Sequence, residues 1–273
     1  MLIDGKALAA DIINELSISV TNIKKRGILP KIAIVTLGDE ETWKAYVDQK
    51  IKLSKILEVD IELVNLKNVT QSELISKLDE LNKDTTIYGI IVQRPFPSNI
   101  DNEIIINAIE AHKDIDGFAL DSDYEVPVWL AVKRILKEVY TQSHVEINFI
   151  EWLKSKNIVI VGKGITAGKP IEMALLKLSI KPIIVRSGTQ NVQEILKNAD
   201  IIISAVGKTI IDSAMVKKGV VLVGVGLHRG ADGKLHGDYE NVSHVAAFYT
   251  PSPGGVGPLN LAYLFKNLLS KIQ

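Results

Sequence analysis

The stretch NIVIVGKGITAGKPIEMALLK, residues 157–177, decides the fold that this sequence predicts. An apolar strand leads into Gly162, Gly164 and Gly168, and a helix with an apolar face follows. Glycines placed this way permit a tight turn, close approach of the backbone to a pyrophosphate, and close packing of helix on strand. The N-terminus of the helix offers unpaired N–H groups to the phosphates. The spacing GxGxxxG is one residue longer than the common fingerprint. Because strand, turn, helix and next strand follow in order, the pattern favours a dinucleotide site over a glycine turn without a ligand.

Similar apolar runs rich in Ile and Val recur along the chain and alternate with amphipathic segments of helical length. Continuous apolar strands separated by helices are typical of parallel sheets covered on both faces. The predicted fold class is therefore α/β with two domains, an amino-terminal α/β domain and a Rossmann-like dinucleotide-binding domain. The expected strands are 31–37, 60–66 and 88–93 in the first half, and 157–162, 181–185, 200–206, 219–225 and 246–250 in the second.

Two helices are expected to connect the halves. Pro127 stands in the first turn of a helical pattern at 126–139, and Pro258 opens the same layout at 257–272. We expect the second of these helices to return to the first domain. The predicted domains are 1–126 joined by 258–273, and 127–257, with a small-molecule cleft between them.

Composition excludes several classes of protein. The 273 residues include 32 Lys+Arg and 32 Asp+Glu, so the net charge is zero, which argues against a nucleic-acid or membrane-surface binder. Without cysteine there are no disulfides or thiolate sites, and the five histidines show no metal-ligand spacing, so no metal is expected. With no signal peptide and no run of 18 apolar residues, we expect a cytoplasmic protein without a membrane span.

The residues after the second strand of the dinucleotide domain predict the cofactor. An NAD site usually carries an acidic residue there, but this chain has Arg186 and Ser187. A cation and a hydroxyl suit a 2′-phosphate, so NADP is favoured over NAD, and Lys163 in the glycine turn adds a second charge. The loops at 205–208 and 224–228 follow apolar strands, where ligands gather in open parallel sheets. The predicted cofactor-binding residues are Gly162, Lys163, Gly164, Gly168, Arg186, Ser187, Val206, Gly207 and Leu227.

Four polar side chains in the first half are candidates for chemistry. Tyr46 and Lys50 are four residues apart and share one face of a predicted helix. Gln93 ends an apolar strand, and Asp116 lies between apolar neighbours beside a glycine. Taken alone, the Tyr46–Lys50 spacing favours an ordinary surface pair on an amphipathic helix.

These residues fall in motifs that together resemble the bifunctional methylenetetrahydrofolate dehydrogenase/cyclohydrolase family. Its members carry a YVxxK helix, a VQxPxP strand end, KDVDGF, a glycine turn GxxxxVGxP, and PVPGGVGPxT. This chain has YVDQK at 46–50, VQRPFP at 92–97, KDIDGF at 113–118, GKGITAGKP at 162–170 and PSPGGVGPLN at 251–260, in that order. The chain also has IDGK at 3–6, ADIIISAVGK at 199–208 and GD at 237–238, at places where members of the family carry similar motifs. The similarity spans essentially the whole chain.

The resemblance implies a folate enzyme of one-carbon metabolism and purine biosynthesis, usually a homodimer, with tetrahydrofolate derivatives bound in the cleft. It would oxidise 5,10-methylenetetrahydrofolate with NADP and hydrate the methenyl product to 10-formyltetrahydrofolate. Lys50 would shuttle the proton for hydration, with desolvation and Gln93 lowering its basicity. Tyr46 would stack on the folate, and Asp116 would accept hydrogen bonds from the pterin.

The resemblance also explains the uncharged loop before the last helix. Pro253, Gly254 and Gly255 would form a rigid surface on which folate and nicotinamide meet without obstructing side chains.

Several positions depart from the family motifs and bear on cofactor fit and on the balance of the two activities. The departures are Trp43 for a usual Ser, Arg94 for Leu, the segment 126–130 with Trp129 for CTPxG, Gly224 and His228 for the Asp and Asn of VIDVGIN, and Asn260 near the end of the last motif. Two alternatives stay open. One is an NADP-dependent dehydrogenase of another small substrate, such as a shikimate-type hydroxy acid. The other is a nucleotide-sensing module without catalysis.

Overall fold

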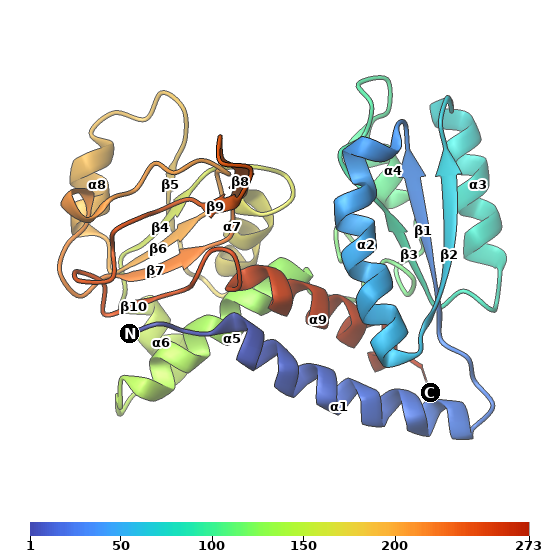
Figure 1. The fold of residues 1–273 in the computed structure, drawn as a ribbon, viewed down its shortest axis with the longest axis horizontal. Coiled ribbons are helices and arrows are strands. Elements are labelled where there is room, and N and C mark those ends of the chain that lie inside the picture. The colour runs from blue at the N-terminus through green and yellow to red at the C-terminus, as the bar shows by residue number, and fades with distance from the viewer. Residues whose placement is uncertain (273) are drawn as a thin grey trace. The chain divides into compact units, whose positions relative to one another are not determined.

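The computed structural model describes residues 1–272, which form two compact units. The five-stranded unit comprises Met1–Ala9 and Val128–Asn260, and the three-stranded unit comprises Ala10–Pro127 and Leu261–Gln273. Each unit is built on a parallel sheet with helices against it, as Figure 1 shows, which confirms the predicted α/β class. The expected ligand-binding domains, 1–126 with 258–273 and 127–257, stay predictions.

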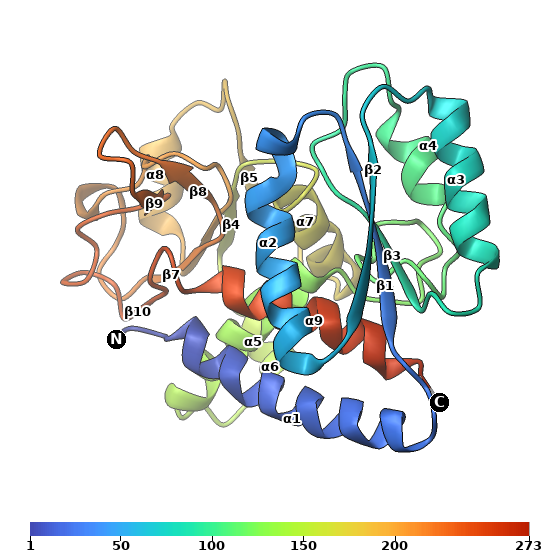
Figure 2. The same ribbon diagram turned by 45° about the vertical axis from the view of Figure 1, so that its right-hand side comes forward.

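The three-stranded unit has the strand order β2-β1-β3, with all pairs parallel. Leucines of α3 and Ile105 of α4 pack with β1 and β3 in one buried cluster, while α2 lies on the opposite side of the sheet (Figure 2). Both faces of the central strand are therefore covered, which explains its continuous apolar sequence. The elements are β1 Lys31–Leu37, α2 Glu40–Leu57, β2 Asp60–Leu66, α3 Gln71–Lys83, β3 Gly89–Val92 and α4 Asn102–Asn107.

The five-stranded unit has the order β10-β7-β6-β4-β5, again all parallel. Every residue of β4, β6 and β7 is buried, because α8 and the segments around it cover one face and α7 contacts β4. The elements are β4 Ile158–Val161, α7 Gly168–Lys177, β5 Ile183–Val185, α8 Val192–Asn198, β6 Ile201–Ser204, a 3-10 turn at Ser213–Met215, β7 Val221–Gly224 and β10 Phe248–Tyr249.

Each of these eight strands lies inside its expected range, so the strand predictions are confirmed. An antiparallel hairpin of β8 (Leu227–Arg229) and β9 (Leu235–Gly237) was not predicted. Its strands are short and largely exposed, so they lack the buried apolar run on which the other predictions rest. Asp232 and Gly233 at its turn were the available signal, because Asp-Gly favours tight hairpin turns and Gly233 has a positive φ of 75°.

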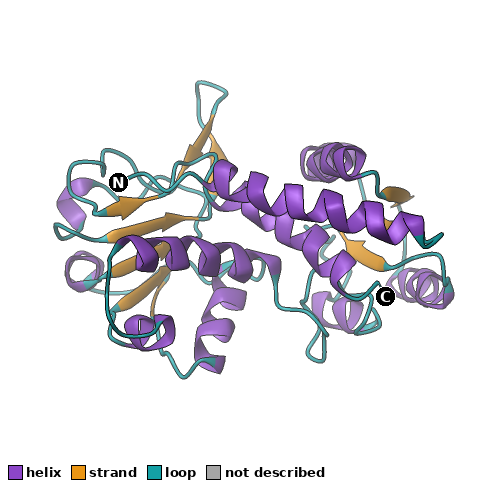
Figure 3. Ribbon diagram, turned by 90° about the horizontal axis from the view of Figure 1, so that it is seen from below, coloured by secondary structure: helices purple, strands orange, loops and turns teal. Residues whose placement is uncertain are grey.

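The remaining helices include both predicted connectors, and Figure 3 shows how helices flank the strands of each sheet. Pro127 is the first residue of α5, and Pro258 lies in the first turn of α9, as a proline without an N–H donor allows. The helices are α1 Gly5–Lys25, α5 Pro127–Gln142, α6 Phe149–Lys154 and α9 Val256–Ser270.

Asn267 on α9 fixes the long segment between α4 and α5. Its side-chain amide donates to the carbonyl oxygens of Ile115 at 2.9 Å and Glu125 at 3.0 Å, and the residue is buried. One side chain therefore holds both ends of the loop that carries Asp116.

Replacing Asn267 by Ala should lower the free energy of unfolding by about 2 kcal/mol, because two buried carbonyls lose a donor. Urea denaturation followed by circular dichroism measures this change. The matched control is Lys266→Ala on the same helix, whose side chain is half-exposed and forms only a 3.5 Å pair with Glu15. Equal stabilities of the two variants would contradict the role given to Asn267.

Candidate functional site

Lys50 and Gln93 form a hydrogen-bonded pair in the three-stranded unit. Lys50 projects from α2, and its Nζ donates to Oε1 of Gln93, just beyond β3, at 2.8 Å. The amide of Gln93 donates in turn to the backbone oxygen of Arg94 at 2.7 Å, which fixes its orientation. The acceptor oxygen therefore faces Lys50, so Gln93 holds the amine in place.

Burial sets the protonation behaviour of Lys50 and Asp116. Desolvation lowers the pKa of Lys50, and the negative charge of Asp116 opposes that shift. Burial likewise raises the pKa of Asp116, against the charges of Lys50 and Arg94. The structure thus brings together three of the four predicted chemical side chains. Tyr46, one helical turn before Lys50, is exposed over 61% of its surface, which leaves its ring open to a planar ligand.

The turn that presents Asp116 is fixed by its neighbours. Asp114 is buried and accepts a hydrogen bond from the backbone N–H of Ala119 at 2.8 Å. Gly117 has φ of 69°, and a Cβ there would stand 2.9 Å from the carbonyl oxygen of Tyr124. The buried Lys113 ammonium caps the end of α3 by donating to the carbonyl oxygens of Leu81, Asn82 and Asp84. The KDIDGF motif is therefore mainly a scaffold that positions one carboxylate.

Lys50, Gln93 and Asp116 form a cluster that also includes Arg94. The sequence had marked Arg94 only as a departure from the family motif. Its guanidinium lies 4.1 Å from the ring centre of Phe118 and 5.8 Å from that of Phe96. Burial lowers the pKa of Arg94, and the charges of Asp116 and Asp114 oppose this. Lys50 and Arg94 therefore share this cluster with the carboxyl groups of Asp116 and Asp114.

The glycine turn of the five-stranded unit has the geometry expected of a phosphate cradle. Gly162 has φ of 99°, and a Cβ on Gly168 would collide with the carbonyl oxygen of Gly162. A Cβ on Gly164 would meet nothing within 4 Å, so neighbouring residues do not require that glycine. The cap residue of α7, Ala167, forms no side-chain hydrogen bond to the helix. The first turn of α7 is thus left without a side-chain cap, as an anion site at a helix N-terminus requires.

The two residues predicted to bind the 2′-phosphate of the cofactor follow β5 directly. Arg186 and Ser187 are both exposed, and the loop is held by a hydrogen bond from the N–H of Arg186 to Oγ1 of Thr189 at 3.0 Å. Lys163 in the glycine turn forms a 3.8 Å ion pair with Glu172 of α7. The side chains of Arg186 and Ser187 are therefore open to a ligand, whereas Lys163 already has a partner.

Asp238 ties together the loops that follow β6 and β7. This fully buried carboxylate accepts hydrogen bonds from four backbone N–H groups, and three of them lie in the loop after β6. The donors are Val206 at 3.1 Å, Gly207 at 2.8 Å, Lys208 at 3.2 Å and Gly226 at 3.2 Å. The predicted residues Val206 and Gly207 are thus fixed relative to the segment that leads to Leu227. The sequence placed the GD motif but could not show what its aspartate holds.

The loop of Pro253, Gly254 and Gly255 is folded back on its own start. A Cβ on Gly255 would stand 2.6 Å from Cβ of Thr250 and 2.7 Å from the carbonyl oxygen of Pro251. Gly254 has φ of 111°, a conformation that only glycine adopts without strain. Packing within the chain therefore explains these two glycines before any ligand is considered.

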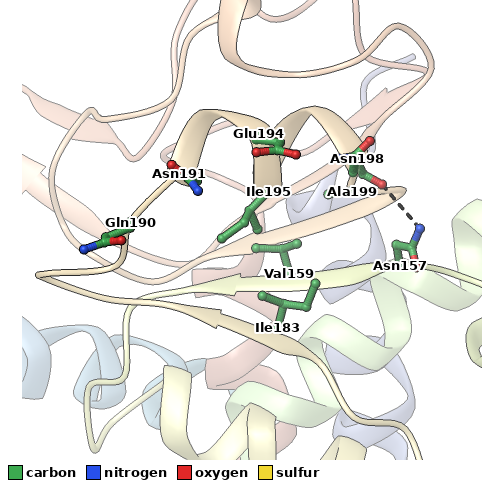
Figure 4. A pocket seen from close by; sticks show the side chains of 9 residues that line it. All are labelled: Asn157, Val159, Ile183, Gln190, Asn191, Glu194, Ile195, Asn198 and Ala199. Atoms are coloured by element: carbon green, nitrogen blue, oxygen red, sulfur yellow. Dashed lines mark hydrogen bonds between the residues drawn. The ribbon is translucent and has the colours of Figure 1, made fainter.

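A separate hollow of about 410 Å³ lies between α8 and strands β4 and β5 (Figure 4). Polar side chains rim it, and the amide of Asn157 donates to the backbone oxygen of Asn198 at 3.4 Å across one end. None of the predicted site residues lines it. The lining residues are Asn157, Val159, Ile183, Gln190, Asn191, Glu194, Ile195, Asn198 and Ala199.

Within residues 1–272, no cluster of three or more His, Asp or Glu side chains is placed to hold a metal ion. No helix in the same range combines the length and apolar character that a membrane span needs.

A Rossmann-like sheet with an open glycine turn defines this chain as a dinucleotide-binding α/β protein. Two family models match it: the tetrahydrofolate dehydrogenase/cyclohydrolase catalytic domain over residues 3–116, and the NAD(P)-binding domain of the same family over residues 143–273. The chain belongs to the tetrahydrofolate dehydrogenase/cyclohydrolase family.

Several known proteins are similar to this chain over nearly its full length and theirs. The bifunctional protein FolD of an Acidovorax species is 35% identical, covering 100% of this chain and 98% of its own. A bifunctional FolD methylenetetrahydrofolate dehydrogenase/cyclohydrolase from Campylobacter jejuni has a TM-score of 0.90 at 32% identity, covering 100% and 98%. The Trypanosoma brucei enzyme, solved with NADP cofactor and inhibitor, has a TM-score of 0.85 at 28% identity, covering 100% and 97%.

Replacing Asp114 by Asn should change stability in a pH-dependent way. Burial, with a smaller contribution from Asp116, raises the pKa of Asp114 from its ordinary 3.8 to about 7. Between these values the folded protein holds a proton that the unfolded chain has released, so its stability falls as pH rises through that window. The Asn variant does not titrate there, and its free energy of unfolding should gain about 4 kcal/mol relative to the wild type between pH 4 and pH 8.

Chemical denaturation at a series of pH values measures the difference. Asp121→Asn, at an exposed position of the same loop, is the control. The difference in unfolding free energy between this variant and the wild type should not change with pH. A flat difference for Asp114→Asn would contradict the raised pKa.

Proposed function

We propose that this protein oxidises 5,10-methylenetetrahydrofolate to 5,10-methenyltetrahydrofolate with NADP, and then hydrolyses that product to 10-formyltetrahydrofolate. The observation that carries the proposal is the half-buried Lys50, hydrogen-bonded to Gln93 beside Asp116, in a chain that matches both family models. Relatives named bifunctional FolD support both activities, and the NADP-bound Trypanosoma brucei enzyme supports the cofactor.

Hydration needs a group that takes a proton from water as it attacks the methenyl carbon. Lys50 suits this role because burial lowers its pKa, which makes the neutral amine more available. The protonated amine can then return that proton to the folate nitrogen as the carbon–nitrogen bond opens, while the hydroxyl of the adduct releases its own proton to solvent and becomes the formyl C=O. Gln93 holds the amine in place throughout through its acceptor oxygen. Asp116 then accepts hydrogen bonds from the pterin, and the exposed Tyr46 ring stacks on it.

Oxidation requires positioning more than acid–base chemistry. NADP supplies the hydride acceptor when bound, and the protein must hold two flat molecules in register. The residues present suit this cofactor, because Gly164 leaves the cradle open, α7 begins without a side-chain cap, and Arg186 and Ser187 are exposed. Pro253, Gly254 and Gly255 supply the uncharged surface between folate and nicotinamide.

Neither alternative accounts for all of these observations. Another small-substrate dehydrogenase or a nucleotide sensor would explain the five-stranded unit, but not the match of the catalytic-domain model over residues 3–116. Three further predictions rest on the family resemblance: a homodimer, action in the cytoplasm, and supply of one-carbon units for purine biosynthesis. No nucleic-acid or membrane partner is proposed.

Replacing Lys50 by Met should slow hydration at least about 100-fold, because a proton-transfer group is lost, while oxidation falls by less than about tenfold. Absorbance of the protein mixed with 5,10-methylenetetrahydrofolate and NADP checks this. The wild type should form reduced cofactor and a methenyl band that decays faster than in buffer, whereas the variant should accumulate the band.

Lys52→Met is the control, since Lys52 is exposed on the same helix. Wild-type decay of the methenyl band in Lys50→Met would exclude Lys50 as the proton carrier. A wild-type protein that converts no folate with either cofactor would contradict the whole proposal.

Replacing Arg186 by Ala should raise the KM for NADP about tenfold and leave the KM for NAD nearly unchanged, because one charge-assisted contact to the 2′-phosphate is lost. Steady-state assays with both cofactors measure the ratio. Lys181→Ala, exposed just ahead of the opposite end of β5, is the matched control. An unchanged ratio in Arg186→Ala would mean that another group reads the phosphate.

A further inference from the structure

The side chain of Tyr239 fills space that Gly224 leaves at the end of β7. A Cβ placed on Gly224 would stand 3.1 Å from Cε1, 3.2 Å from the hydroxyl oxygen and 3.3 Å from Cζ of Tyr239. Position 224 is also where the family motif carries Asp. The tyrosine ring therefore occupies a place where a side chain at 224 would project, and it brings its own polar group there.

The Tyr239 hydroxyl is bonded to Thr250, the first residue of the 250–255 loop. It donates to the carbonyl oxygen of Thr250 at 2.6 Å and pairs with Oγ1 of the same residue at 2.8 Å. The N–H of Thr250 donates to the carbonyl oxygen of Leu222 at 3.1 Å and to the Tyr239 hydroxyl oxygen at 3.2 Å, and the N–H of Gly224 donates to Thr250 Oγ1 at 2.9 Å. Burial raises the pKa of Tyr239 to about 12, so the hydroxyl keeps its proton and remains a donor. Thr250 is thus held at three polar atoms.

Thr250 in turn sets the position of the glycines that follow. The backbone of Gly255 packs so closely against Thr250 that a Cβ there would stand 2.6 Å from Cβ of Thr250. A Cβ on Gly237, two residues before Tyr239, would collide with the side chain of Ser252. A displacement of Thr250 therefore has to move the 253–255 backbone.

The neighbouring residue prevents Tyr239 from moving independently. Asp238 is anchored by backbone N–H groups after both β6 and β7, including that of Gly207 at 2.8 Å. The dipeptide Asp238–Tyr239 thus joins three loops at the carboxyl ends of β6, β7 and β10, the edge at which ligands bind in open parallel sheets.

We propose that Tyr239 is a positioning residue, whose hydroxyl, in the space beside Gly224, holds Thr250 and thereby fixes the 250–255 loop for hydride transfer. This inference rests on the proposed function, because it takes that loop to lie against folate and nicotinamide. Tyr239 itself touches neither ligand in this proposal, and its hydroxyl does the work that a carboxylate at 224 would otherwise do.

Replacing Tyr239 by Phe should lower kcat of the dehydrogenase about tenfold, the loss that accompanies a missing buried hydrogen bond. Hydration of supplied 5,10-methenyltetrahydrofolate should stay within about twofold, because it involves no hydride transfer. Tyr249→Phe is the matched control, since the Tyr249 hydroxyl takes no hydrogen bond within residues 1–272, and it should leave both activities unchanged.

A second test replaces Gly224 and Tyr239, first singly and then together. Gly224→Asp alone should lose dehydrogenase activity because its Cβ meets the Tyr239 ring, and Tyr239→Val alone should lose it with the hydroxyl. The double variant should recover to within about threefold of the wild type, because a carboxylate then bonds Thr250 in space that is free. Such recovery cannot come from a purely additive loss of packing.

Three results would overturn the inference: unchanged dehydrogenase activity in Tyr239→Phe, equal losses of both activities in that variant, or a double variant that folds and is no more active than the weaker single one. Thermal unfolding of each variant shows whether it is folded. If the double variant does not fold, the comparison of Tyr239→Phe with Tyr249→Phe decides. A wild type without folate turnover contradicts the proposed function instead, whereas an active wild type and an unaffected Tyr239→Phe contradict only this inference.

Discussion

Parallel strands that are buried on both faces leave only the ends of the strands for polar chemistry. In this protein β4, β6 and β7 contain no exposed residue, so every polar group of a site must come from the loops or from side chains that reach past a strand end. Gln93 follows directly on β3. The glycine turn follows β4, and the loops held by Asp238 follow β6 and β7.

Loops placed this way are precise only if something holds them, and buried hydrogen bonds do so here. Asp238 satisfies four backbone N–H groups, and Asn267 satisfies two carbonyls on either side of the Asp116 turn. A buried carboxylate or amide is costly unless all its partners are present, so such residues specify one loop conformation among many. The scaffold residues are as specific as those that would touch a ligand.

In the cluster around Lys50, burial and the neighbouring charges shift the pKa values in opposite directions. Burial favours the neutral forms of Lys50 and Asp116, while their mutual attraction favours the charged forms, and Arg94 adds a second positive charge. Arg94, in place of the usual leucine, is thus the departure from the family motif that adds a charge to this cluster. Trp43, another departure, is buried on α2, and its indole N–H has no hydrogen-bond partner among residues 1–272.

The sequence by itself determined the strands, their parallel arrangement, the glycine turn and the motifs of the family, because these depend on local patterns of apolar residues and glycine. Through the family resemblance it also placed Lys50, Gln93 and Asp116 at one folate site. Only the tertiary structure decided that Oε1 of Gln93 accepts from Nζ of Lys50 at 2.8 Å, and that Asp238 holds the N–H of Gly207, 31 positions away. The same holds for Tyr239 beside Gly224. Contacts between distant residues depend on how whole elements pack, and no local pattern of residues encodes that packing.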